Sequence, residues 1–137
     1  MQSAGTPCFA IVTSSEGRLS PVEIGEISVF EVHPEGREVW VASAKQRGGV
    51  TLRPGECLEY GFEAPDVDTL VSPRELELER RYAVSINAGV SDDGSRGSRQ
   101  YRANFCVTST ADKRVAVHQV QWDRKAEEWG WDVCSSL

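Results

Sequence analysis

The sequence predicts an all-β fold, and two stretches with alternating side chains carry that prediction. Residues 101–108 place Phe105 and other apolar residues on one face, and residues 57–62 repeat the pattern. A period of two is typical of a strand that is buried on one side. Cys106 and Cys57 lie on the opposite faces of their stretches. There they are better placed to bridge to a neighbouring strand than to fill the main core.

Further runs of β-branched and aromatic residues complete a set of eight or nine short strands. They are separated by glycine, proline, serine and aspartate, which favour turns. The expected strands lie, in chain order, at residues 8–13, 22–30, 38–42, 50–52, 57–62, 82–86, 101–108, 115–122 and 129–134. Regular spacing of short antiparallel strands predicts a β-sandwich, either Ig-like or a related open barrel.

Phase changes within two of these strands predict β-bulges. The apolar residues of the strand at 22–30 change face near Gly25, where one extra residue would restore the pairing. Val117 and Val120 also differ in phase, which predicts a second bulge in the strand at 115–122. The first strand, at 8–13, is apolar on both faces and is therefore expected to be central in a sheet.

Three other segments are expected to be less regular. Ser72 and Pro73 are good helix starters, but the strand-like alternation after them limits the expectation to at most one helical turn. The polar residues 123–128 are expected to form one further helical turn. Residues 91–98 are rich in serine, aspartate and glycine, which predicts a flexible, exposed loop.

Length and charge limit the classes of function. The chain has 137 residues, which predicts one domain at 8–137 after a flexible N-terminal segment at 1–7. Its net charge of −6 argues against nucleic acid or an anionic membrane as the main partner. No run of about 20 apolar residues occurs, so no transmembrane segment is expected. A monomer is expected.

Cysteine usage predicts the compartment. The chain has four cysteines and two histidines, and no two cysteines form a CxxC pair, so a zinc site is not expected. An even number of widely spaced cysteines favours two disulfides and an oxidising compartment. Buried free thiols in a reducing compartment are the alternative. The first residues do not resemble a secretion signal, so we expect the mature form of an exported domain.

No residue pattern indicates catalysis, a metal or a cofactor. His33 precedes a proline in a turn, His118 lies on an expected strand, and neither has a neighbour at ligand spacing. The Gly-x-Ser-x-Gly elbow of serine hydrolases is absent. The acidic residues at 66–68 and 92–93 do not complete the calcium-loop pattern. We therefore expect a non-enzymatic protein with no catalytic residue, no metal and no cofactor.

The charge is distributed unevenly, which suggests a partner surface. Residues 56–79 hold eight of the 21 acidic residues and, in Arg74, one of the 15 basic ones. They form either a solvated rim or a docking surface for a basic protein. Trp129 and Trp131 are expected to cover the core or an edge. Charge and loop flexibility place the partner surface on 56–79 and 91–99, at Glu63, Asp66, Asp68, Glu75, Glu77, Asp92, Asp93 and Arg96.

Several short strand patterns together resemble a known family over residues 8–122. They are Cys8-Phe9-Ala10-Ile11-Val12, Cys57-Leu58-x-Tyr60-Gly61, Tyr82-x-Val84-x-Ile86 and Tyr101-x-Ala103-x-Phe105-Cys106-Val107. This set is similar to a family of small periplasmic lipoproteins known as type VI secretion immunity proteins. The resemblance implies a non-enzymatic periplasmic β-domain, lipid-anchored upstream of this sequence, that binds and neutralises a secreted toxin.

Two points stay open, the anchor and the function. Cys8 follows Thr6 and Pro7, which is not a lipid-attachment motif, so the sequence itself does not carry the implied anchor. The chain would otherwise be an accessory Ig-like β-sandwich of a cell-surface or adhesion protein.

Four cysteines allow three disulfide pairings. The resemblance makes Cys8 and Cys57 recurrent in the family, and a three-strand meander that starts at Cys106 can return Cys134 beside it. We therefore expect the bridges Cys8–Cys57 and Cys106–Cys134. A Cys57–Cys106 bridge or four free thiols would contradict that expectation.

Overall fold

The computed structural model describes residues 2–3, 6–11, 22–32, 36–46, 49–53, 55–90, 97–109 and 114–134. In these residues it has twelve strands and one short 3₁₀ helix. The elements are β1 (Gln2–Ser3), β2 (Thr6–Phe9), β3 (Val22–Glu31), β4 (Glu38–Ala44), β5 (Thr51–Leu52), β6 (Leu58–Glu59), β7 (Val67–Val71), β8 (Tyr82–Val90), β9 (Gly97–Ser109), β10 (Val115–Val120), β11 (Trp122–Asp123), β12 (Glu128–Trp129) and η1 (Trp131–Cys134).

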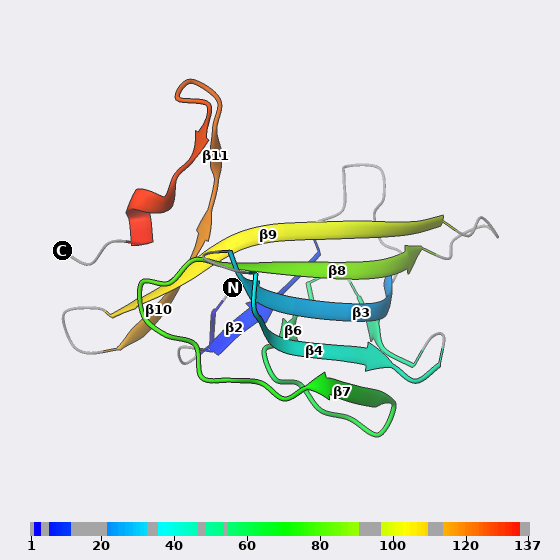
Figure 1. Cartoon of the computed structure of the whole chain (residues 1–137). Coiled ribbons are helices and arrows are strands. Elements are labelled where there is room, and N and C mark those ends of the chain that lie inside the picture. The colour runs from blue at the N-terminus through cyan, green and yellow to red at the C-terminus, as the bar shows by residue number, and fades with distance from the viewer. Residues whose placement is uncertain are drawn as a thin grey trace.

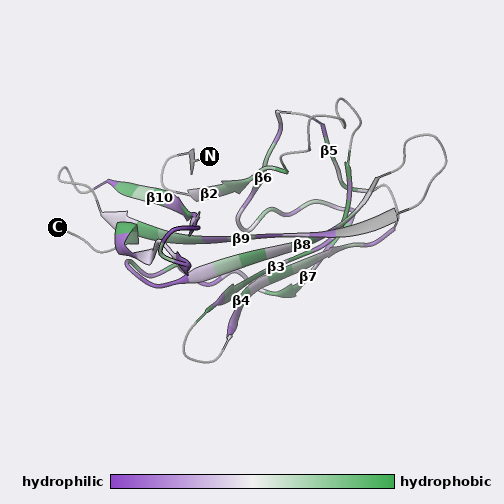
Figure 2. Cartoon of the chain, turned by 90° about the horizontal axis from the view of Figure 1, so that it is seen from above, coloured by the Kyte–Doolittle hydropathy of each residue, from purple (hydrophilic) through white to green (hydrophobic). Residues whose placement is uncertain are grey.

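A large antiparallel sheet forms the body of the molecule (Figure 1). Its strand order is β10-β9-β8-β3-β4-β7, and β5 pairs with β3 beside this path. A small sheet of order β1-β2-β6 lies over one face of the large sheet, as Figure 2 shows from above. The fold is therefore all-β and sandwich-like, as the alternating patterns predict. Five strands have only two residues, which explains why there are more than the eight or nine expected.

The main core lies between the two sheets. Phe9 and Leu58 enter it from the small sheet, and Trp40, Tyr82 and Phe105 enter it from the large one. The Phe105 ring stacks on Tyr82 with 5.6 Å between centroids and meets Phe9 at 5.5 Å. Aromatic pairs contribute about 0.5–1.5 kcal/mol beyond the burial of their area. This aromatic cluster therefore joins the two sheets.

A second, smaller cluster lies apart from the main core and consists of Cys106, Val120 and Cys134 with Trp131 packed against them. It shows why the bulge predicted in the strand at 115–122 is wrong. The pairing of β10 with β9 runs without a register shift from Val115 to Val120. Val117 packs against the main core and Val120 against the second cluster. The phase change in the sequence reflects a strand with an apolar contact on each face.

The bulge predicted near Gly25 is confirmed. The pairing of β3 with β8 shifts register between Ile24 and Glu26, so Gly25 is the extra residue. An added Cβ at Gly25 would lie 3.4 Å from the carbonyl oxygen of Asn87, so the close approach of β8 favours glycine there. The first strand is central as expected, because β2 lies between β1 and β6 in the small sheet, but it spans Thr6–Phe9 instead of 8–13, and residues 12–13 lie outside the described residues.

The C-terminal region differs from its prediction. Residues 123–128 do not form a helical turn but close a hairpin, in which Trp122 pairs with Trp129. The Asp123 carboxylate accepts the backbone N–H of Lys125 at 2.9 Å and that of Ala126 at 3.2 Å, which favours a tight turn over a helix. Residues 131–134, expected as the end of a strand, form the helix η1.

Two further expectations need correction. Residues 72–77 contain no helical turn, which agrees with the expectation of at most one, but the expected strand at 57–62 is paired only at Leu58–Glu59. Gly61 has a φ of +82°, and this left-handed conformation turns the chain out of the small sheet. The N-terminal segment 1–7 was expected to precede the domain, but β2 begins at Thr6 and pairs there with Ser3 of β1.

Both expected disulfides are present in the structure. The Cα atoms of Cys8 and Cys57 are 5.4 Å apart, and those of Cys106 and Cys134 are 5.8 Å apart. No free cysteine remains. The first bridge fastens the small sheet to the segment before β6, and the second fastens η1 to β9. Two disulfides are typical of proteins that fold in an oxidising compartment.

Removal of the Cys106–Cys134 bridge should destabilise the protein more than removal of Cys8–Cys57. The chain-entropy model gives about 4.1 kcal/mol for the 49-residue separation and about 3.6 kcal/mol for the 28-residue one. However, Cys106 and Cys134 are both buried, whereas in the first bridge Cys8 is buried and Cys57 is exposed, so alanine at 106 and 134 removes more buried contacts and adds a larger cavity cost, of about 1–3 kcal/mol. Urea unfolding of the two double alanine variants measures the difference, and a larger loss without Cys8–Cys57 would contradict it.

Candidate partner-binding surface

The acidic surface predicted from the sequence surrounds β7, the edge strand of the large sheet (Figure 1). Among the described residues, β7 pairs with β4 alone. Asp68, Thr69 and Leu70 are all exposed, and Leu70 shows 60% of its surface. A large aliphatic side chain that is this exposed on an unpaired edge is a feature of interaction sites as well as of aggregation-prone edges.

Three of the predicted residues gather at the start of β7. Glu63 and Asp66 lie on the turn before the strand, and Asp68 lies within it; all three are exposed. The backbone holds them in place, because Val67 N–H donates to the Ala64 carbonyl at 3.0 Å and Lys45 N–H donates to that of Asp66 at 2.7 Å. We call Glu63, Asp66 and Asp68 the β7 acids.

The β7 acids are only weakly neutralised. Lys45 lies 3.8 Å from Asp68, and both side chains are more than half exposed, so this ion pair is worth at most about 1 kcal/mol. Within the described part of the chain, Glu63 and Asp66 form no ion pair. The start of β7 therefore presents a net negative field to solvent.

Glu75 and Glu77 lie farther along the chain, on the connection from β7 to β8. This connection first follows β4, because Arg74 N–H donates to the Val39 carbonyl at 2.9 Å. Glu77 then forms an ion pair with Arg80 at 3.1 Å. Its charge is thus partly compensated, and the structure separates it from the β7 acids. Asp92, Asp93 and Arg96 lie outside the described residues.

A buried carboxylate that the sequence analysis did not single out lies at the end of β3. Glu31 is 3% exposed and accepts from Arg37 at 2.6 Å and 3.1 Å and from Arg80 at 3.2 Å. A sequence signal existed, because Glu31 continues the buried alternation of Ile27 and Val29. A carboxylate in that phase needs a cationic partner. This group of charges is structural and fastens the connection before β8 to β3.

Tyr60 fastens the start of the same connection. Its hydroxyl lies 2.6 Å from the carbonyl oxygen of Arg74 and 3.2 Å from that of Val39, and it donates toward both. Its ring meets Trp40 edge-on at 5.3 Å between centroids. Burial raises the pKa of Tyr60 from 10.0 to about 12, although the Arg74 backbone contact opposes the rise. Tyr60 therefore remains a neutral donor well above physiological pH.

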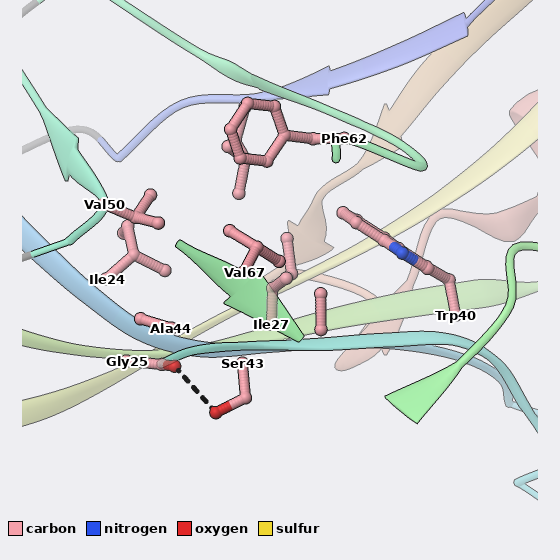
Figure 3. A pocket seen from close by; sticks show the side chains of 11 residues that line it. Ile24, Gly25, Ile27, Trp40, Ser43, Ala44, Val50, Phe62 and Val67 are labelled. Atoms are coloured by element: carbon pink, nitrogen blue, oxygen red, sulfur yellow. Dashed lines mark hydrogen bonds between the residues drawn. The ribbon is translucent and has the colours of Figure 1, made fainter. Parts of the chain in front are cut away.

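A cavity of about 230 Å³ in the described part of the chain is bordered by Phe9, Ile86 and Tyr101, among other residues, and no cluster of titratable side chains lines it. None of the histidine, cysteine, aspartate and glutamate side chains of the described residues form a group of three that could hold a metal. His118 Nε2 lies 2.8 Å from Thr108 Oγ1, which is a side-chain contact between β10 and β9. A cavity of about 10 Å³ beneath Phe62 is lined by apolar side chains, and Ser43 bonds away from it to Gly25 (Figure 3). This space holds at most about one water molecule.

Comparison of the chain with family models, with curated proteins and with solved structures finds no match. In the described residues, no helix has the length and apolar character needed to cross a membrane. The β7 acids and the edge strand that carries Asp68 are thus the surface on which a functional proposal can be built.

Loss of both arginines should destabilise the protein more than loss of the carboxylate they bind. The double change Arg37→Ala and Arg80→Ala leaves Glu31 charged and buried without a partner. We expect it to lower the free energy of unfolding by about 3–5 kcal/mol. The change Glu31→Gln removes the charge and keeps the shape of the side chain, so we expect the free energy of unfolding to fall by only about 1–2 kcal/mol. Urea unfolding at pH 7 measures both variants. An equal or larger loss for Glu31→Gln would show that the buried charge is not the dominant cost.

Stability should fall between about pH 10 and pH 12, and Tyr60 should cause part of the fall. Because its folded pKa lies above its ordinary value, its stabilising contribution is complete below pH 10 and is lost as the pH rises toward 12. Burial also raises the pKa of Tyr82, which adds to the effect. The free energy of unfolding of the Tyr60→Phe variant should therefore decline less steeply over this range. Parallel curves for the two proteins would contradict the assignment.

Proposed function

We propose that this chain is an exported, non-enzymatic immunity protein that binds a secreted toxin and neutralises it. The observation that carries the proposal is the group of β7 acids on an open sheet edge. An inhibitor of this kind needs a surface that complements its target and needs no catalytic group. A negative field on that surface favours a target with a basic face and speeds the encounter between the two.

The rest of the molecule supports such a role through rigidity. The two disulfides and the aromatic core fix the sheet from which β7 is presented. A surface that is already ordered loses little conformational entropy on binding, which favours high affinity. As part of the proposal, we assign the protein to the periplasm, where disulfides form and where it would meet an incoming type VI toxin. A lipid anchor upstream of this sequence would keep it at the membrane surface.

The test is a binding experiment with the protein encoded by the neighbouring gene. Purified chain should retain this protein in a pull-down, and its expression should restore growth to cells that carry the toxin in the periplasm. Absence of both binding and protection would overturn the proposal.

Charge reversal at the β7 acids should slow association with the toxin. In the variant Glu63→Lys, Asp66→Lys and Asp68→Lys, we expect the association rate at low salt to fall by about tenfold or more, because electrostatic steering is lost. The matched control reverses Glu38, Glu127 and Glu128, which are exposed elsewhere, and changes the net charge equally. Surface plasmon resonance at two salt concentrations measures the rates. Equal rates for the two variants would exclude the β7 surface.

A second function is favoured by one feature of the C-terminal hairpin, which projects away from the sheets (Figure 1). Trp122 and Trp129 are 48% and 42% exposed and meet edge-on at 5.4 Å, although aromatic cover of the core had been expected from Trp129. Exposed tryptophan is common at binding hot spots. An accessory domain of an adhesion protein would use such a pair. Binding to glycans or matrix proteins that is lost on Trp122→Ala, without toxin binding, would support it.

A further inference from the structure

The β7 edge has outward backbone groups as well as charge, although the outward N–H of Val67 already donates to the Ala64 carbonyl. Lys45 N–H donates to the Asp66 carbonyl, and the pairs continue as Ala44 with Val67, Ser43 with Asp68 and Ala42 with Thr69. In an antiparallel pair, residues alternate between bonding to the partner strand and pointing away from it. The backbone N–H and C=O groups of Asp66 and Asp68 thus point toward β4, and those of Thr69 point away from it.

Two features of β7 limit what can pair with its edge. Leu70 has no partner in β4, because the register shifts between Thr69 and Val71, and such a bulge interrupts a regular edge. A second copy would bring a further set of the β7 acids and a net charge of −6 to this edge, and like charges repel. The same charges attract a basic strand, so the edge selects its partner by charge.

We propose that β7 binds an extended basic segment of its partner protein as an added strand of the large sheet. This proposal rests on the proposed function and names its mode of recognition. Backbone bonds to the outward groups of β7 supply part of the affinity, and side chains supply specificity. The β7 acids lie at the N-terminal end of the strand, so lysine or arginine belongs at that end of the added segment. An aliphatic residue belongs beside the exposed Leu70.

The opposite edge of the same sheet provides an internal control. The strand β10, residues Val115–Val120, also pairs with one neighbour alone among the described strands, and it contains no acidic residue. A segment recognised only by its backbone would bind either edge. A segment recognised by backbone and charge together binds β7.

The test uses an acetylated and amidated peptide of seven alternating lysines and valines, titrated into ¹⁵N-labelled protein. Amide shifts should appear in β7 and β4 and be absent from β10. The variant Thr69→Pro removes an outward N–H and should weaken binding about tenfold, whereas Thr69→Ala, which keeps it, should bind like the unchanged protein. If Thr69→Pro does not fold, a peptide with N-methyl groups at alternate residues makes the same comparison and should bind about tenfold more weakly.

Each contrary outcome has a distinct meaning. Equal binding of the plain and N-methylated peptides, with shifts confined to the β7 acids, overturns strand addition but leaves the acidic toxin-binding surface intact. Shifts in β10 as large as those in β7 overturn selection by charge. A concentration-dependent dimer that Thr69→Pro abolishes would make a second copy the occupant and overturn the proposal. Absence of any shift at millimolar peptide overturns it outright, and the toxin pull-down still decides the proposed function separately.

Discussion

Phe105 and Cys106 are adjacent on β9 and point to opposite faces of the large sheet, and both hydrophobic clusters depend on this. Phe105 contacts Phe9 and Tyr82 and so joins the small sheet to the large one. Cys106 bonds to Cys134 and holds η1 on the other face. Because side chains alternate along a strand, a register slip of one residue would exchange the two. The tight packing on both sides therefore specifies a single register for β9.

Some charged side chains form ion pairs that stabilise the fold, and others are exposed to solvent. Glu31 is buried and is matched by Arg37 and Arg80, and Arg80 also pairs with Glu77. These arginines neutralise the acids near the ends of β3 and β8. Among the described residues, the one ion pair at the start of β7 is that of Lys45 with Asp68, at 3.8 Å. The local excess of negative charge at β7 is thus what remains after the structural ion pairs have formed.

The sequence predicted those features that depend on local periodicity. The all-β class, the bulge at Gly25 and the off-core position of Cys106 all follow from which face each side chain takes. Features that depend on tertiary contacts were missed. The phase change between Val117 and Val120 looks like a bulge until η1 is known to cover the second face. The pairing of Trp122 with Trp129 depends on the side-chain bonds of Asp123, which override the helical tendency of the polar residues between them.

The candidate site shows the same division. Composition identified the acidic segment, because eight acids and one base in 56–79 are visible in the sequence. Composition could not distinguish Glu77 from Asp66 and Asp68. Glu77 is paired with Arg80, which also binds Glu31, whereas Asp66 and Asp68 lie at the edge strand β7.

The open edges of the large sheet follow from how the sandwich is built. The small sheet covers part of one face, and within the described residues it does not pair with β7. Natural proteins protect such edges with charge, bulges or short strands, and β7 has all three. Protection by charge has a particular consequence, because it discourages the chain's own acidic copies and leaves basic strands free to approach. The device that prevents aggregation at β7 is thus also able to select a partner.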